Sequence, residues 1–366
     1  MKKYTAQNYY DAIDAFAPFS LGQSWDNNGI LIGSPEREVT RALVCVDATA
    51  AVLDEAAQSG AELVVAHHPI IFEAIKSILE EDAVYRAIKL GLAVLCAHTN
   101  LDIATGGIND ILARMLDLEG IEVLDTTKTS PYRKFVVYAP TDSVEAIYNA
   151  MSQAGAGRQG EYSGAAFLSA GEGRFLPLAG AKPAIGNVGR LERVKEERLE
   201  MLVAPENEQA VMRALRAAHP YEEPAYDILE THFNRERLGF GRIGSLKEPV
   251  APERFASFVR EKLCLSSLKY VPGREPVSRV ALCGGSGGTF LEQAWKKGAQ
   301  ALVTADIKHD RLLRAQDLGM TVIDAGHYPT EAVVLPFLVE QLKAALPGAD
   351  IRKAQSCADP GIVLGG

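Results

Sequence analysis

The segment Gly60-Ala61-Glu62-Leu63-Val64-Val65-Ala66-His67-His68-Pro69 is the most informative part of this chain. A short apolar run, typical of a buried strand, ends on two adjacent imidazoles. Burial of apolar surface does not explain two histidines at a strand terminus, so we interpret them as nitrogen ligands. The chain has only seven histidines, and His98, His309 and His327 also follow short apolar runs, beside carboxylates. This distribution indicates a metal site.

The same local pattern occurs a second time near the end of the chain. GAELVVAHHP (60–69) and LGLAVLCAHTNLD (90–102) resemble GAQALVTADIKHD (298–310) and LGMTVIDAGHYPTE (318–331). Each copy has Gly-Ala, an apolar run, polar residues, a helical stretch, Leu-Gly, a second apolar run, and a histidine four residues before a carboxylate. We interpret this as an internal duplication. The two strand ends should meet across a pseudo-twofold axis, because open α/β sheets place their sites at the carboxyl ends of parallel strands.

Strands alternate with helices in both outer thirds. The first third predicts strands at 42–46, 63–66 and 93–97, with helices at 48–59 and ending near residue 90. The last third predicts strands at 280–283, 301–304 and 322–324, with helices at 289–297 and 310–318. This alternation is typical of a largely parallel sheet covered by helices. We therefore predict an α/β fold of two pseudo-repeated halves, residues 1–126 and 234–366.

The middle segment, residues 127–233, has a different character. It predicts a strand at 135–138, a helix at 144–153, a strand at 165–168, and a further strand and helix between 199 and 218. The β-α-β-β-α-β order is typical of a ferredoxin-like α+β domain. We expect such a domain to be inserted into a loop of the α/β host.

Composition limits the classes of function. The net charge of -9 opposes a nucleic-acid-binding surface, so small molecules are the expected partners. No run of about 18 apolar residues and no apolar signal core occur, which opposes membrane insertion and export. The five cysteines are odd in number, scattered, and form no Cys-x-x-Cys pair, as expected in a reducing cytosol. We predict a folded, soluble, cytoplasmic protein of two or three domains.

Six side chains form the main candidate site. His98 and Asp102, like His327 and Glu331, are four residues apart, which places each pair on one face of a helix. Imidazole and carboxylate together suit zinc, manganese, iron or cobalt, and this many ligands exceed one tetrahedral ion. The pattern therefore favours two ions bound by residues drawn from His67, His68, His98, Asp102, His327 and Glu331. The alternative is a set of separate core or capping histidines satisfied by hydrogen bonds.

The glycine-rich segment 284–288 allows a different chemistry. It places Ser286 in a Gly-x-Ser-x-Gly pattern between a strand and a helix, with Asp306 or Asp324 and then His327 downstream. This order suits a serine hydrolase. A plain tight turn or an anion-binding helix start is the simpler interpretation.

Two further segments carry candidate residues. Trp25, Asp26 and Asn28 precede the apolar run 30–32, where they either form a turn packed on the core or contact a substrate. Asp47 ends the next strand with the same two interpretations. His219 lies between proline-rich neighbours and is interpreted as part of a rigid loop or a subunit contact rather than a ligand.

Five motifs together resemble the NIF-three-like family, also described as dinuclear metal centre, hexameric proteins and as GTP cyclohydrolase type-two homologues. The motifs are SWDNNGILIG (24–33), VVAHHPIIF (64–72), AHTNLD (97–102), TADIKH (304–309) and GHYPTE (326–331), in the family's order. The middle segment resembles the PII/CutA-like insert of long bacterial members through GAGRQGEYSGAAF (155–167), GEGRFLPLAGAKPAIG (171–186) and HPYEEPAYDI (219–228).

The resemblance implies which residues bind metal. Two divalent transition-metal ions per chain would be held by His67, His68, Asp102, His327 and Glu331, with Glu331 and also Asp102 as candidate bridges and His98 nearby. The family's third block usually has two histidines after Asp-Ile-Lys, whereas here His309 is followed by Asp310. The resemblance further implies a homohexameric ring with inward-facing metal sites.

A metal-dependent hydrolase is the function that these residues favour. Two ions can activate water and orient a substrate oxygen, which suits a nucleotide, a phosphoester or a purine ring as substrate, with zinc as the expected metal. His98 or His309 would transfer protons, and Trp25, Asp26 or Asn28 would contact the substrate. A non-catalytic metal-loaded scaffold, regulatory or for protein interactions, and a serine hydrolase based on Ser286 are the alternatives.

Overall fold

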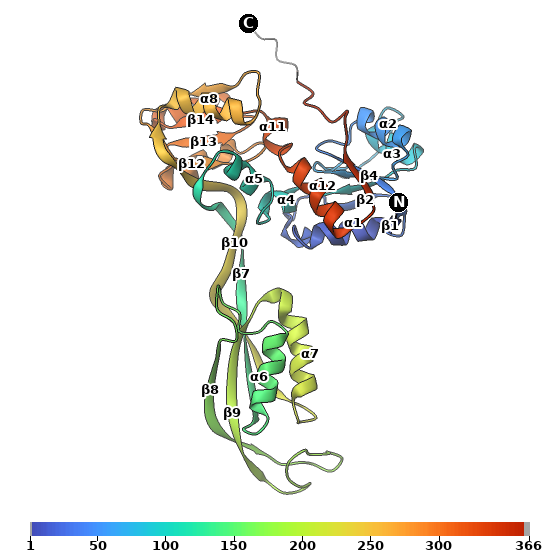
Figure 1. Cartoon of the computed structure of the whole chain (residues 1–366), viewed down its shortest axis with the longest axis vertical. Helices are drawn as coiled ribbons and strands as arrows, with labels where there is room; N and C mark the ends of the chain where they lie inside the picture. The colour runs from blue at the N-terminus through green and yellow to red at the C-terminus, as the bar shows by residue number, and fades with distance from the viewer. Residues whose placement is uncertain (1, 362–366) are drawn as a thin grey trace. The chain divides into compact units, whose positions relative to one another are not determined.

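Figure 1 shows the computed structural model, which describes residues 2–361, without the side chains of residues 129, 130, 206 and 233–237. The chain divides into two compact units. Unit 1 combines Met1–Lys128 with Leu238–Gly366, and unit 2 is the continuous segment Thr129–Arg237. Among the described residues, no helix combines the length and the apolar character needed to cross a membrane.

The first sheet of unit 1 has five strands in the order β15-β4-β5-β6-β2. The strands β15, β4, β5 and β6 run parallel, and β2 is antiparallel to β6. Helices α1 and α12 contact each other and strands of this sheet. Helices α2 and α3 also contact each other and strands of this sheet, and they form a separate layer (Figure 1). The bounds are Gly29–Ile32 (β2), Arg41–Cys45 (β4), Leu63–Ala66 (β5), Ala93–Cys96 (β6), Asp350–Lys353 (β15), Ala6–Asp14 (α1), Ala50–Ser59 (α2), Ala83–Lys89 (α3) and Val334–Ala345 (α12).

The second sheet contains the other set of parallel strands. Its order is β11-β14-β13-β12-β10-β7-β9-β8, where β7 is Glu119–Pro140, β8 is Ala166–Phe175, β9 is Glu192–Val203 and β10 is Ala225–Val250. The strands β12, β13 and β14 are parallel, while β11 and β10 pair antiparallel at their sides. Side chains alternate between two cores: Val280 and Leu282 pack with α8, whereas Ala281 packs with α9. The bounds are Lys269–Val271 (β11), Val277–Leu282 (β12), Ala301–Thr304 (β13), Thr321–Asp324 (β14), Pro252–Lys262 (α8), Leu291–Lys296 (α9) and His309–Leu318 (α10).

Buried polar contacts connect the two halves of unit 1. Asn109, on α5 (Ile108–Met115), donates to the carbonyl of Asp102 at 3.0 Å and accepts from the Gly284 amide at 2.9 Å. Arg242, on β10, makes two hydrogen bonds of 2.8 and 2.7 Å to the Asp110 carboxylate. These contacts fix the short helices α4 (Thr99–Ile103) and α5 against the second half, where α11 (His327–Glu331) follows β14.

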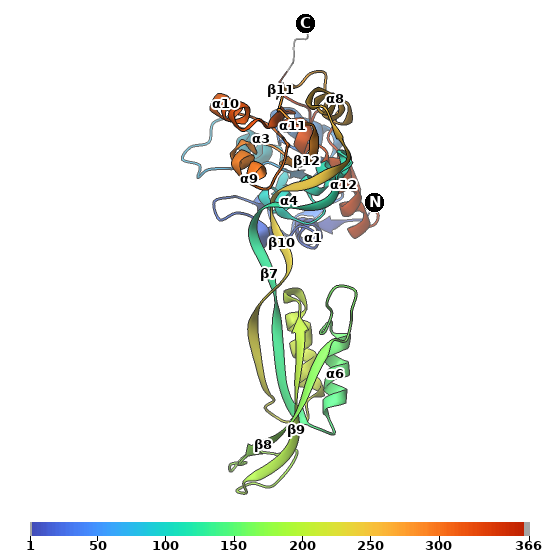
Figure 2. The same ribbon diagram turned by 90° about the vertical axis from the view of Figure 1, so that its left-hand side faces the viewer.

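Unit 2 has the predicted β-α-β-β-α-β order. Its elements are β7 (Glu119–Pro140), α6 (Val144–Gln153), β8 (Ala166–Phe175), β9 (Glu192–Val203), α7 (Glu208–Ala218) and β10 (Ala225–Val250), and the long strands β7 and β10 continue into unit 1. Apolar residues of α6, α7 and the sheet share one core, which includes Phe135, Met151 and Leu215. Figure 2 shows α6 beside the strands of this unit. The α/β fold with an inserted α+β segment is confirmed.

The strands of unit 2 are longer than their apolar runs predict. β8 extends to Phe175, beyond the predicted end at residue 168, because it pairs with β9 over ten positions. The backbone hydrogen bonds to β9 continue there through charged residues such as Glu172 and Arg174. These residues do not alternate with apolar ones, so the sequence gives no strand signal for them. The strand predicted at 135–138 is likewise only the part of β7 near its carboxyl end.

Candidate metal centre

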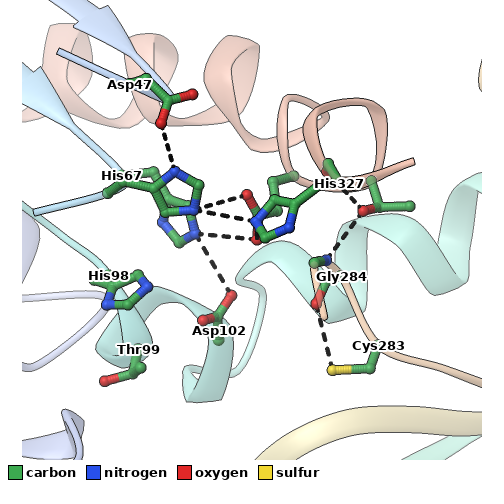
Figure 3. Close-up of polar contacts among 12 residues, drawn as sticks. Asp47, His67, His98, Thr99, Asp102, Cys283, Gly284 and His327 are labelled. Carbon is green, nitrogen blue, oxygen red and sulfur yellow. Dashed lines mark hydrogen bonds and ion pairs between the residues drawn. The ribbon is translucent and has the colours of Figure 1, made fainter. Parts of the chain in front are cut away.

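The candidate ligands all follow the carboxyl ends of parallel strands. His67 and His68 come directly after β5, and His98 lies between β6 and α4, which carries Asp102. His327 and Glu331 begin and end α11, which follows β14. His327 and Glu331 therefore share one face of a helix, as predicted, whereas His98 precedes α4 as its N-cap, with a non-helical backbone. Figure 3 shows side chains from both halves of unit 1 meeting here.

Glu331 is the centre of the cluster. One carboxylate oxygen lies 3.1 Å from His327 Nε2, and the other lies 3.1 Å from His68 Nε2. The Nε2 atoms of His68 and His327 are 3.4 Å apart, and His67 Nε2 is 3.8 Å from Glu331 Oε1. His68 and His327, which are 259 residues apart in the sequence, thus converge on one buried carboxylate.

Every imidazole of the cluster is oriented through its Nδ1 atom. His67 Nδ1 is 2.9 Å from the Ala97 carbonyl oxygen, so it must donate a proton there. His68 Nδ1 lies 2.8 Å from Asp47, His98 Nδ1 lies 2.7 Å from Asp26, and His327 Nδ1 lies 2.5 Å from Asp306. An oxygen acceptor on Nδ1 fixes the tautomer that leaves Nε2 with a lone pair, which is how proteins orient histidine ligands.

The charges of the metal-free cluster balance one another. Burial opposes the charged form of His68, but hydrogen bonds to Asp47 and Glu331 outweigh it and raise its pKa to about 10. The hydrogen bond to Glu331 raises the pKa of His327 to about 9. Burial alone would raise the pKa of Glu331, yet the surrounding imidazoles lower it far below its usual range. Protons on these nitrogens therefore neutralise a carboxylate that a cation could neutralise instead.

Two buried polar atoms test whether a metal ion suits the cluster. His67 Nε2 and Asp102 Oδ1 are 3.9 Å apart, and neither has a hydrogen-bond partner among the described residues. Buried polar atoms without a hydrogen-bond partner are costly in free energy. Two ligand atoms on one ion, each about 2.0–2.2 Å from it, are separated by a distance similar to that between His67 Nε2 and Asp102 Oδ1. The residues present therefore fit a metal ion.

The spacing of the ligand atoms allows two ion-binding groups. His67, His68 and His98 form one, and His68, His327 and Glu331 form the other, with the ligand atoms of each within 4.8 Å of one another. His98, which the family resemblance places only nearby, thus also has the spacing of a ligand. His68 belongs to both groups, so the groups are adjacent.

The glycine-rich turn forms one wall of this centre. Gly285 has a φ of +62°, and a Cβ on it would lie 2.2 Å from Glu331 Oε1 and 3.3 Å from His327 Nε2. Its amide donates to Thr330 Oγ1 at 3.0 Å, and the Gly287 amide donates to Thr304 Oγ1 at 2.8 Å. The turn is therefore built for a close backbone approach to the ligands.

Comparisons with known proteins agree with these motifs. The family model Duf34/NIF3 (NGG1p interacting factor 3) matches residues 4–360. The chain belongs to this family. It is 40% identical to a Bacillus subtilis protein named GTP cyclohydrolase 1 type 2 homolog, over 89% of each chain.

Solved structures of Duf34/NIF3 relatives have the same fold. A Bacillus cereus protein related to NIF3 is 34% identical, with a TM-score of 0.91 and full coverage of both chains. The Staphylococcus aureus protein SA1388 is 27% identical, with a TM-score of 0.79 and full coverage of both chains. The resemblance stated from the five motifs is therefore confirmed.

The predicted substrate residues have different surroundings in this Duf34/NIF3 chain. The Asp26 side chain is buried and engaged by His98 and Thr99, so it positions His98 instead of facing a substrate. Trp25 is 59% exposed and its ring lies 6.4 Å from that of His98. Asn28 is half-buried, and its amide occupies the space that a side chain at Gly22 would need.

The other predicted residues lie apart from the ligand cluster. His309 is exposed at the start of α10, and no described contact joins it to the four imidazoles. Ser286 is exposed, and in the described residues it makes no hydrogen bond to His327, whose nitrogens face Asp306 and Glu331. His219 accepts from the Tyr221 amide and contacts the Tyr138 carbonyl, which fits the rigid loop that we expected.

Residues that orient the ligands were the ones that sequence interpretation missed or left undecided. From the sequence, Asp47 fits either a turn or a site role, Asp306 is a candidate only as a partner of Ser286, and Phe72 carries no signal of its own. Asp306 and Phe72 nevertheless lie inside the motifs TADIKH and VVAHHPIIF, Asp306 shortly after the end of β13 and Phe72 in the loop that follows β5. A carboxylate at such a strand end was the available signal.

Proposed function

We propose that this chain is a metal-dependent hydrolase that acts on a nucleotide, a phosphoester or a purine ring. The observation that carries the proposal is the unpartnered pair His67 Nε2 and Asp102 Oδ1 beside Glu331, in a cluster whose imidazoles are all oriented through Nδ1. His67, His68, Asp102, His327 and Glu331 would hold two ions, expected to be zinc, or else iron, manganese or cobalt. The name of the B. subtilis relative is compatible with a purine nucleotide as substrate.

When bound, such a pair of ions supplies Lewis-acid activation of water and of a substrate oxygen. The protein supplies orientation. Asp47 and Asp306 fix the rings of His68 and His327, and the Gly285 backbone closes the side of Glu331. Asp26 keeps the Nδ1 proton of His98 in place, which leaves His98 Nε2 free to take up and release a proton. Among the residues that the structure describes, none makes such a contact with His309, so we assign proton transfer to His98 alone.

Metal analysis tests the ligand assignment. Protein purified without added metal and then titrated with Zn²⁺ should bind two ions per chain in elemental analysis. His68→Ala and Glu331→Ala should each bind fewer, because each removes a ligand atom from the cluster. His232→Ala, which removes an exposed imidazole of unit 2, is the matched control. Full metal content with unchanged affinity in either ligand variant would show that this residue is not a ligand.

Turnover distinguishes the hydrolase from its alternatives. A panel of nucleotides and phosphoesters should reveal activity that a chelator abolishes and added metal restores. With a substrate found, Ser286→Ala should keep most turnover and His327→Ala should lose nearly all of it. Severe loss in both variants would support a serine nucleophile instead, because triad members act as a unit. Two bound ions with no turnover on any substrate would support the scaffold.

A further inference from the structure

Two exposed aromatic rings lie beside the metal centre. Trp25, in the loop before β2, is 59% exposed, and Phe72, after His68-Pro69, is 53% exposed. Their ring centroids are 6.1 Å apart. Each ring also lies edge-on to the same imidazole, that of His98, at 6.4 Å for Trp25 and 6.3 Å for Phe72. The three rings form one continuous aromatic surface, which we call the aromatic wall.

The backbone around the aromatic wall is anchored, although the rings are exposed. Asn27 Nδ2 donates to the Ile71 carbonyl at 2.6 Å, which joins the loop that carries Trp25 to the residue next to Phe72. Asp26, which directly follows Trp25, accepts from the Thr99 amide at 3.1 Å. Aromatic side chains usually contribute to stability by being buried, and these two rings are instead exposed to water on an anchored backbone. Contiguous exposed apolar surface of this kind typically marks a binding site.

The position of His98 connects the aromatic wall to the candidate ligands. Its ring lies 5.3 Å from that of His67 and 5.6 Å from that of His68. One imidazole therefore separates Trp25 and Phe72 from the atoms that would hold the ions. A molecule that places a flat ring on the aromatic wall can place an attached phosphate or other oxygen-rich group at the metal ligands. A nucleotide has both parts in one molecule.

We propose that Trp25 and Phe72 bind the nucleobase of a nucleotide whose phosphate-bearing end reaches the metal ligands. This proposal rests on the proposed function and gives its substrate class: a nucleotide rather than a phosphoester without a ring. Every nucleobase has a π-face, so the aromatic wall would bind a nucleotide more tightly than a sugar phosphate that has no base. It would not distinguish one base from another, because stacking does not read hydrogen-bonding groups. Phe72 is a specificity-determining residue in this scheme, and Trp25 gains a defined partner.

The chain itself offers a direct probe of this contact. It contains two tryptophans, Trp25 and Trp295, so Trp295→Phe leaves Trp25 as the single indole fluorophore. Trp295 lies on α9 and its substitution changes no part of the aromatic wall. The Trp295→Phe protein would be titrated with GMP, with AMP and with ribose 5-phosphate, with and without added Zn²⁺. A base stacked on Trp25 should quench its emission, and a sugar phosphate without a base should not.

We expect saturable quenching by GMP and AMP only. Phe72→Leu in the Trp295→Phe background keeps an apolar side chain but removes the ring, and it should raise the dissociation constant for GMP at least about fivefold, as expected for the loss of one base–aromatic contact. Metal content of the Phe72→Leu variant, compared with its parent, verifies that the neighbouring ligands are intact. Equal dissociation constants for GMP in the two proteins would overturn the role of Phe72.

The remaining outcomes separate this proposal from its alternatives. Quenching by ribose 5-phosphate as strong as by GMP, or no quenching by any nucleotide, would overturn the nucleobase site. Trp25 emission that changes with protein concentration alone would also overturn it, because the aromatic wall would then be covered by a second copy of the chain. Base-dependent quenching without any hydrolysis would keep the nucleobase site and refute the hydrolase. Metal-dependent hydrolysis of phosphoesters without base-dependent quenching would keep the hydrolase and refute the nucleobase site.

Discussion

Asp306 has a backbone φ of +53°, in the left-handed region that costs a residue with a side chain about 1–2 kcal/mol. Aspartate is among the residues that enter this region most readily. Its carboxylate accepts from His327 Nδ1, so the unusual backbone conformation occurs where a candidate ligand is oriented. Strained backbone often occurs at functional sites, and at Asp306 it accompanies the orientation of a candidate ligand.

Gly285 gives the first prediction at the residue scale. Gly285→Ala would place a methyl group 2.2 Å from Glu331 Oε1 at a φ of +62°, so Glu331 must move. We expect the variant to bind at least one metal ion fewer per chain than the wild type in elemental analysis. Gly288→Ala is the matched control in the same turn, since its Cβ would meet only ordinary contacts near 3.9 Å. Equal metal content in both variants would contradict a close approach of the turn to Glu331.

The histidine pKa values predict opposite pH trends for the metal-free and metal-loaded protein. In the folded state the pKa of His68 is raised to about 10 and that of His327 to about 9, from 6.5. Their contribution to the free energy of unfolding is thus complete below pH 6.5 and is lost as the pH rises towards 9–10. Metal binding displaces the same protons, so metal affinity should increase over this range.

Thermal unfolding at pH 6.5, 7.5, 8.5 and 9.5 measures both trends. The melting temperature of chelator-treated protein should decrease across the series. The difference in melting temperature between metal-loaded and metal-free protein should increase. Parallel curves for the two forms would show that the protons and the metal ions do not compete for the same nitrogens.

The ligands could be predicted from the sequence, whereas most of their partners could not. His98 with Asp102, and His327 with Glu331, have a local spacing that survives in any helix. Asp26 is 72 residues from His98, and Asp47 is 21 residues from His68, so their hydrogen bonds depend on how strands are ordered in the sheet. Local periodicity contains no information on that order, and Asp26 was therefore interpreted as a substrate residue.

At the scale of elements, apolar periodicity located most strands and helices of unit 1 and the helices of unit 2. Helix α6 (Val144–Gln153) has the predicted bounds, because its apolar residues repeat at helical spacing and glycines follow it. The ends of β7, β8 and β10 were not predictable. These strands continue as backbone ladders through charged residues, and a ladder depends on a neighbouring strand rather than on local hydrophobicity.

A buried ion pair fixes α5 against β10, and its removal gives the element-scale prediction. Arg242 is 3% exposed, and Arg242→Met would leave Asp110 buried without its bidentate partner. We expect the free energy of unfolding to fall by about 3–5 kcal/mol in urea titrations, the usual cost of an uncompensated buried charge. Arg314→Met removes a comparable but exposed contact with Glu292 and should have little effect.

The double variant Arg242→Met/Asp110→Leu identifies the cause. Replacing both partners with apolar residues removes the buried charge, so much of the lost stability should return. A double variant no more stable than Arg242→Met would show that the guanidinium acts chiefly through its other contacts. Those contacts are hydrogen bonds to the carbonyls of Gly239, Gly241 and Ala104.

At the scale of the whole molecule, assembly is still a proposal. We expect a homohexamer, and native mass spectrometry would show a species of six chains. The edge strand β8 exposes Phe167 and Leu168 in the isolated chain, which is the kind of surface that proteins cover on assembly. Charged substitutions at these two residues should shift the mass distribution towards smaller species if β8 takes part in the assembly.

The independence of the insert is the last prediction. The two points at which the chain passes between unit 1 and the insert lie close together. Thr127 Oγ1 donates to the Leu238 carbonyl at 3.5 Å, and a Cβ on Gly239 would lie 1.8 Å from the Asp125 carbonyl oxygen. Chain ends this close can be joined by a two-residue Asn-Gly turn in place of Thr129–Arg237. All the candidate ligands lie in unit 1, so the deletion protein should fold and bind two ions per chain, with only its assembly altered. Circular dichroism measures folding, and elemental analysis measures the metal content. If the deletion proteins are insoluble or metal-free with several different linkers, the two units depend on each other for folding.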